Sequence, residues 1–222
     1  MGKLIFKGLV KLILGFLLIA LLIFLSAGSI YYLQGWLFIG ILFIPMFIAG
    51  VILIIKNPDL LKKRLNAKEE EKTQQLIIKL SALMFIVGFV LAGLSYRYNW
   101  TMLPLWVSIV FSVIFFVMYG FYIEVMRENT YLSRTIEVQE DQTVVDTGMY
   151  RIVRHPMYSV TLIMFLAITF ILGSVVSIPI FLFYPFIIVK RIKNEEKVLE
   201  EGLKGYTDYK NKVRYRLVPF IW

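Results

Sequence analysis

The sequence predicts an all-α integral membrane protein, and its composition and charge pattern carry that prediction. Hydrophobic residues make up 59% of the 222 residues, whereas soluble domains usually carry about 45–50%. The mean hydropathy is +0.75. Charged residues are absent from five long blocks, which are residues 12–33, 36–55, 80–96, 100–123 and 157–189. Because the chain contains no cysteine, the sequence excludes disulfides, thiolate nucleophiles and zinc–thiolate sites.

Each of the first four blocks fits one transmembrane helix, since about 20 apolar residues cross a hydrocarbon core of about 30 Å. The first block follows Lys3, Lys7 and Lys11, and it resembles a signal peptide. A second span follows almost at once, so we expect the first helix to be retained.

The fifth block, residues 157–189, predicts a tight hairpin of two short helices. As one helix it would be about 50 Å long, which is too long for a single span. Gly173, Ser174, Ser177 and Pro179 lie near its middle and favour a turn. The prediction is therefore six transmembrane helices, with five helices and a re-entrant segment as the alternative.

The basic residues predict the orientation, because they mark the cytoplasmic side of a membrane protein. With six crossings, Arg97 is the one of 24 basic residues on the far side, and all 15 acidic residues lie on the near side. We therefore expect an N-in/C-in topology with the polar face in the cytoplasm. The net charge of +9 fits attraction to anionic lipid headgroups. A nucleic-acid partner is not supported, because the basic residues flank spans and are interleaved with glutamates.

One membrane domain, residues 1–222, accounts for the whole chain, since the polar segments are shorter than the roughly 50 residues of a domain. Residues 1–123 hold the four amino-terminal spans, and residues 124–222 hold the polar motifs. We expect an amphipathic surface helix over residues 60–79 and a small β-hairpin over residues 135–145.

The residues most typical of chemistry stand at the two ends of the fifth block. His155, the one histidine of the chain, follows Arg154 and precedes Pro156, which favours a helix start with free backbone N–H groups. This corner could bind a carboxylate or phosphate, or it could be a basic anchor at the membrane boundary. Beyond the hairpin, Arg191 and Glu195 are four residues apart and could form an ordinary surface ion pair. Because a hairpin returns its ends to one face, we expect Arg191 and Glu195 to lie beside His155.

These elements resemble the isoprenylcysteine carboxyl methyltransferase family and its prokaryotic relatives over about residues 128–216. The matching residues are Gly148, Tyr150, the run Arg154-His155-Pro156-Met157-Tyr158, Arg191, Ile192, Glu195, Glu196, Leu199, Tyr206 and Tyr209. The family usually has a glycine where this chain has Val160, so close helix packing or the approach of the cofactor differs here.

The resemblance implies a membrane methyltransferase that uses S-adenosylmethionine, in the plasma membrane of a prokaryote. No metal is expected, because the chain has one histidine and no cysteine. Its acceptor would be lipidic or amphiphilic and would enter between helices; a carboxylate is favoured, with a lipid amine or a small thiol as alternatives. The resemblance implies these cofactor-binding residues: Gln142, Thr143, Val144, Val145, Tyr150, His155, Pro156, Met157, Tyr158 and Glu195. Arg191 matches the catalytic residue that faces the substrate carboxylate. No glycine-rich dinucleotide fingerprint follows a strand anywhere in the chain, so the cofactor would have to bind at this membrane-embedded site.

Three alternatives stay open from the sequence. A membrane reductase of sterol-like substrates that uses NADPH has a similar carboxyl-terminal layout, although the Arg-Ile-x-x-Glu-Glu element favours a methyltransferase. A catalytically silent relative is compatible with Val160. Transport is disfavoured, because the four amino-terminal blocks contain no ionisable residue of the kind that transport pathways use.

Overall fold

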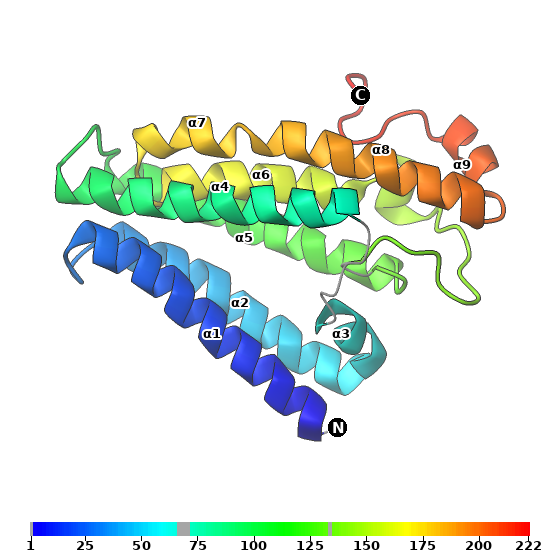
Figure 1. Ribbon diagram of the computed structural model, residues 1–222, viewed down its shortest axis with the longest axis horizontal. Coiled ribbons are helices and arrows are strands. Elements are labelled where there is room, and N and C mark those ends of the chain that lie inside the picture. The colour runs from blue at the N-terminus through cyan, green and yellow to red at the C-terminus, as the bar shows by residue number, and fades with distance from the viewer. Residues whose placement is uncertain (1, 66–71, 133–134) are drawn as a thin grey trace.

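The computed structural model describes residues 2–65, 72–132 and 135–222, and the regular elements in these ranges are all helices (Figure 1). The helices are α1 (Gly2–Ala27), α2 (Leu33–Lys56), α3 (Pro58–Leu65), α4 (Lys72–Arg97), α5 (Leu105–Glu128), η1 (Gly148–Arg151), α6 (Pro156–Ile171), η2 (Val175–Ser177), α7 (Ile178–Phe181), α8 (Tyr184–Gly202) and α9 (Tyr206–Lys212).

Helices α4, α5, α6 and α8 form a bundle, and α1 and α2 make a pair that crosses it at an angle. In Figure 1 this pair meets the bundle at one end and diverges from it toward the end where α3 lies. The core between the helices is aromatic: Phe38, Phe115 and Phe181 are among its fully buried side chains. The polar carboxyl-terminal segments gather at the α3 end, beyond the apolar parts of the bundle.

Within the described residues, five helical segments are long and apolar enough to cross a membrane, so the chain is an integral membrane protein. They are Gly2–Ala27, Leu33–Lys56, Gln74–Arg97, Leu105–Glu128 and Val175–Gly202, while Pro156–Ile171 is an apolar helix of shorter length. The prediction of an all-α membrane fold is confirmed. Six crossings and the N-in/C-in orientation stay predictions.

The chain turns back within residues 157–189, where the sequence predicts it. Gly173 has a φ of +67°, and a Cβ there would lie 2.3 Å from Gln34 Nε2, so the turn requires glycine. Ser174 caps the start of η2: its hydroxyl accepts a hydrogen bond of 3.3 Å from the N–H of Ser177, the last residue of η2. Helix α6 and the segment from η2 to α8 are thereby antiparallel neighbours (Figure 1).

The predicted surface helix over residues 60–79 is wrong in the part that the structure describes. Helix α3 ends at Leu65, residues 66–71 lie outside the described residues, and α4 already begins at Lys72. Gln74 and Ile77 are buried, at 0% and 3% exposure. The stretch from Gln74 is part of the apolar segment Gln74–Arg97, which is long enough to cross a membrane, so it belongs to a candidate transmembrane helix.

The predicted β-hairpin over residues 135–145 is also wrong. The segment is irregular, with a turn at residues 140–141. Bonds to one aromatic residue replace a strand ladder: Gln139 Nε2 donates to the Tyr131 carbonyl, and the Tyr131 hydroxyl donates to the Asp141 carbonyl at 3.0 Å. Side-chain bonds of this kind compete with regular secondary structure.

We predict that Gly93→Ala destabilises the fold by about 1–3 kcal/mol, the usual cost of overpacking a core. A Cβ on Gly93 would lie 1.9 Å from Ser26 Oγ and 2.6 Å from the Ile23 carbonyl, where α1 and α4 touch. Gly40→Ala is the matched control, since nothing lies within 4 Å of its Cβ position. Thermal unfolding in detergent should show a lower Tm for Gly93→Ala than for the unchanged protein, and an equal or higher Tm for Gly40→Ala. If Gly93→Ala has the same Tm as Gly40→Ala, this packing is contradicted.

Candidate active site

A cavity of about 110 Å³, part of it open to solvent, lies at the polar end of the bundle. Its walls come from the end of α5, the irregular segment after it, the start of α6, the polar part of α8, and α9. The lining residues are Asn129, Tyr131, Leu132, Thr135, Ile136, Glu137, Gln142, Thr143, Val144, Val145, Tyr150, Arg154, His155, Met157, Tyr158, Arg191, Glu195, Leu199, Leu203, Tyr206 and Tyr209.

Gly148 fixes the approach of the chain to the cavity. Its φ is +47°, and a Cβ there would lie 1.3 Å from Glu128 Oε1, so only glycine fits. The Glu128 carboxylate accepts a hydrogen bond of 3.1 Å from the Met149 N–H at the start of η1. The end of α5 therefore holds the short helix that carries Tyr150.

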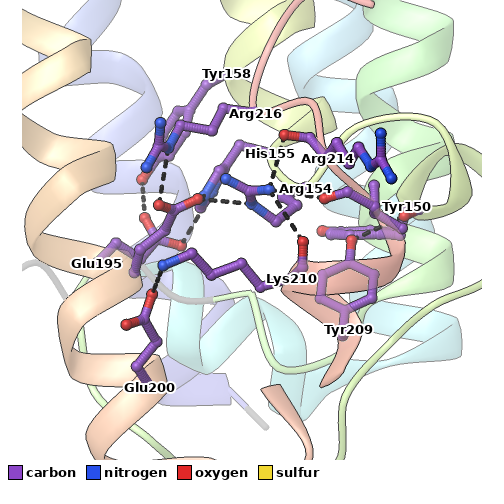
Figure 2. A network of polar contacts seen from close by, with 12 residues as sticks. Tyr150, Arg154, His155, Tyr158, Glu195, Glu200, Tyr209, Lys210, Arg214 and Arg216 are labelled. Atoms are coloured by element: carbon purple, nitrogen blue, oxygen red, sulfur yellow. Dashed lines mark hydrogen bonds and ion pairs between the residues drawn. The ribbon is translucent and has the colours of Figure 1, made fainter. Parts of the chain in front are cut away.

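Tyr150 is buried between α5 and α9. Its hydroxyl accepts a hydrogen bond of 3.1 Å from Asn129 Nδ2, and its carbonyl accepts one of 2.8 Å from the Tyr209 hydroxyl (Figure 2). Burial raises the pKa of Tyr150 well above its ordinary value. The phenol therefore stays neutral and contributes an aromatic wall.

His155 stands immediately before α6, and Pro156 takes the first helical position, as the sequence predicts. The backbone N–H groups of Arg154 and His155 donate to the carbonyls of Tyr215 and Arg216, each at 2.9 Å. The carboxyl-terminal segment is thus bonded along the start of α6, so the approach to the helix start is covered by the chain itself.

Glu196 of α8 is the centre of the polar network behind the cavity. It is 3% exposed, and its carboxylate lies 2.7 Å from Arg154 Nε and 2.8 Å from Arg216 Nε. The ring nitrogen Nε2 of His155 lies 3.3 Å from the same carboxylate. Figure 2 shows Arg154, His155 and Arg216 gathered at this point. One carboxylate therefore joins α8, the start of α6 and the carboxyl-terminal segment.

The expected anion site at Arg154 needs correction, because internal groups already occupy this side chain. Besides Glu196, its Nη1 donates to the Val213 carbonyl at 2.7 Å and to the Arg214 carbonyl at 3.0 Å. With 6% of the residue exposed, Arg154 acts as a structural cation that binds the chain's own carboxylate and tail.

Tyr158 joins the two ends of the hairpin on the cavity side. Its hydroxyl donates to Glu195 Oε2 at 2.6 Å and accepts from Arg191 Nε at 2.9 Å. The Tyr158 ring also stacks on the His155 ring, with centroids 5.7 Å apart. Arg191 continues away from the cavity to Gln74 Oε1 of α4, at 3.2 Å. The predicted proximity of Arg191 and Glu195 to His155 is therefore confirmed, with Tyr158 as the link.

Tyr206 presents a buried polar group to the cavity. The residue is 4% exposed, and within the described parts of the chain its hydroxyl has no hydrogen-bond partner. Burial raises its pKa, and the nearby Glu196 and Glu195 raise it further. The hydroxyl is therefore a neutral donor, and a buried donor without a partner favours a ligand that accepts its hydrogen bond.

The structure brings nearly all the expected site residues to one cavity. Those that line it are Gln142, Thr143, Val144, Val145, Tyr150, His155, Met157, Tyr158, Arg191 and Glu195. Pro156 does not line the cavity but begins the helix that carries two of them, Met157 and Tyr158. Val160 is buried in the main core and is not a lining residue, so its side chain does not narrow the cavity directly.

Sequence reasoning missed several lining residues and the role of Glu196. Leu199 follows Glu195 by four residues, which places it on the same side of α8, and this spacing could have identified it. Leu203 comes directly after α8 and carried no such signal. Asn129, Tyr131 and Leu132 follow α5 and carried no such pattern. Among residues 2–65, 72–132 and 135–222 no cluster of possible metal ligands occurs; that no metal takes part stays a prediction.

Comparison with known families gives one match. Residues 107–201 match the model of the isoprenylcysteine carboxyl methyltransferase (ICMT) family. The matched segment runs from α5 through the hairpin into α8, so it includes Tyr158, Arg191 and Glu195 but ends before α9. No curated protein matches the chain. Together with the apolar helices, the match implies a membrane methyltransferase in the general sense.

We predict that Glu196→Gln lowers the stability by about 3 kcal/mol or more, because it leaves Arg154 buried without its counter-charge. The measurement is thermal unfolding in detergent. Glu201→Gln on the same helix is the control: Glu201 and its partner Lys197 are exposed, at 68% and 73%, and this pair should contribute nothing measurable. A Glu196→Gln protein as stable as the control would show that the buried network is dispensable.

Proposed function

We propose that the chain, a relative of the ICMT family, is an S-adenosylmethionine-dependent methyltransferase with a lipidic or amphiphilic acceptor, most favourably a carboxylate. The observation that carries the proposal is the linked set of Arg191, Tyr158 and Glu195 at the wall of the cavity. The Tyr158 hydroxyl holds a cation and an anion there: it lies 2.9 Å from Arg191 Nε and 2.6 Å from Glu195 Oε2. The set offers one charge for a cationic cofactor and the opposite charge for an anionic acceptor.

The chemistry of the cavity wall fits S-adenosylmethionine. Glu195 offers a carboxylate to the ammonium group, and the Tyr206 hydroxyl offers a buried donor to an acceptor atom. Tyrosine rings suit both a planar base and a sulfonium, which is attracted to the face of an aromatic ring. The segment from Gln142 to Val145 is irregular, so it has backbone groups available to a ligand that a strand ladder would have used.

When bound, S-adenosylmethionine supplies an electrophilic methyl group for in-line displacement by a nucleophile. The task of the protein is then to align the two reactants and exclude water, and alignment alone can contribute several kcal/mol. An acceptor carboxylate is already ionised, so no general base is required. This agrees with the position of His155, whose Nε2 faces Glu196 rather than the open part of the cavity.

Arg191 is suited to position the acceptor. A guanidinium binds carboxylates with a planar fork of donors, and this one is kept in place by Tyr158 on the cavity side and by Gln74 of α4 on the other. Because the side chain extends from the cavity to a transmembrane helix, an acceptor with an apolar tail could place its carboxylate at Arg191 while the tail stays among the helices.

We predict that Arg191→Ala lowers methyl transfer at least 100-fold, since misplacing one reactant by about 1 Å has a cost of that order. Transfer from labelled S-adenosylmethionine into membranes that contain the protein measures this effect, and identification of the labelled product distinguishes carboxylate, amine and thiol acceptors. Lys193→Ala, an exposed cation on the same helix, serves as the control and should transfer normally. Full activity in Arg191→Ala would refute its role.

We predict that Tyr206→Phe weakens S-adenosylhomocysteine binding about 3- to 10-fold, the effect of losing one neutral hydrogen bond. The unliganded protein should keep or raise its Tm, because the change removes a buried hydroxyl that has no partner among the residues that the structure describes. Tyr209→Phe should instead lower the Tm, since it removes the bond to the Tyr150 carbonyl. Calorimetric titration measures the binding. Saturable binding of NADPH, with none of S-adenosylhomocysteine, would favour a reductase and contradict the proposal.

A further inference from the structure

A second hollow lies on the other side of α3, away from the cavity. It is an open groove of about 490 Å³ between the first turns of α1 and the short helix α3. The residues that line this groove are Lys3, Leu4, Lys7, Pro58, Asp59, Lys62 and Leu65. None of them lies in the segment that matches the ICMT family.

The groove is formed by one face of each helix. Lys3 and Lys7 are one turn apart on α1, and Lys62 and Leu65 are three apart on α3, so in both cases the side chains point the same way. The Lys11 ammonium donates to the Leu65 carbonyl and ties the end of α3 to α1. Gly8 of α1 faces the end of α3, since its Cβ position lies 3.7 Å from Leu65 Cδ1, an ordinary contact distance.

The charge of the groove favours an anion. Lys3, Lys7 and Lys62 contribute three positive charges, and Asp59 offsets one, so the lining carries a net charge of +2. All three lysines are exposed. Ammonium groups near a membrane surface attract anionic headgroups, with a contribution of about 1 kcal/mol each.

The surroundings of the groove favour a lipid over a free anion. Leu4, Pro58 and Leu65 give it apolar walls. The outward side of α1 continues as exposed apolar residues, beginning with Phe6 at 71% and Ile13 at 55% exposure. A phosphodiester held by the lysines would therefore have its acyl chains beside an apolar helix.

We propose that this α1–α3 groove binds the headgroup of one anionic phospholipid. Helix α3 then has the lipid on one side and the cavity wall on the other: the Lys63 ammonium lies 5.7 Å from the centre of the Tyr131 ring, and Arg64 Nη1 lies 3.8 Å from Met157 Sδ. Both Tyr131 and Met157 line the cavity. The bound lipid stabilises the position of α3 against that wall.

The experiment uses the full-length protein in detergent, titrated with phosphatidylglycerol and followed by native mass spectrometry. The variant Lys3→Gln/Lys7→Gln/Lys62→Gln should bind the first lipid about 100-fold more weakly, if each lysine contributes about 1 kcal/mol. The matched control Lys79→Gln/Lys193→Gln/Lys204→Gln removes the same charge from exposed positions elsewhere and should bind it normally. Asp59→Asn should bind it several-fold more tightly.

Two further ligands identify the source of the anion. Phosphatidylcholine should bind at least tenfold more weakly than phosphatidylglycerol, and inorganic phosphate should not displace bound phosphatidylglycerol at millimolar concentration. The proposal is overturned if the two triple variants lose lipid equally, if Asp59→Asn has no effect, or if phosphate alone competes with the lipid.

Discussion

The buried carboxylate of Glu196 is the constraint on which the polar half of the structure depends. It lies within 2.8 Å of two guanidinium groups, those of Arg154 and Arg216, and 3.3 Å from the His155 ring. A charge at this depth requires partners, because desolvation without them costs several kcal/mol. The partners come from two separate parts of the chain, Arg154 and His155 before α6 and Arg216 near the carboxyl terminus. Meeting this requirement therefore fixes how α6, α8 and the carboxyl-terminal segment sit together.

The arrangement of the cavity follows from that constraint. Glu195 and Glu196 are adjacent on α8 and diverge by about 100° around the helix axis, so one faces the cavity and the other faces the network. The His155 ring stands between them, with Nδ1 3.9 Å from Glu195 Oε1 and Nε2 toward Glu196. Tyr158, one turn into α6, then reaches both Glu195 and Arg191. The buried ion pair of Arg154 and Glu196 therefore lies next to the residues that face the cavity, and both groups are positioned by α8 and the start of α6.

Much of this could be predicted from the sequence, because charge exclusion and turn residues are strong signals in a membrane protein. The apolar blocks predicted the long helices, and Gly173 with Ser174 predicted the turn that returns Arg191 to His155. The partners of Arg154 could not be predicted, since backbone carbonyls of residues 213 and 214 carry no sequence signal. Because these partners are hidden in the sequence, the sequence predicts a site for an external anion at Arg154, where the chain supplies the carboxylate of Glu196 instead. The sequence does not predict that α4 begins as early as Lys72, because its first residues are polar and are typical of a surface segment. Tertiary packing buries some of them, including Gln74.

The relation between Arg154 and Glu196 tests this account most directly. A double-mutant cycle would compare Arg154→Met, Glu196→Gln and the double variant by their free energies of unfolding in mixed micelles. The account predicts a coupling energy of about 2 kcal/mol or more, because the two groups are in direct contact and buried. Effects that add to within about 0.5 kcal/mol would contradict it, since they would mean that the start of α6 and α8 are held together by other contacts.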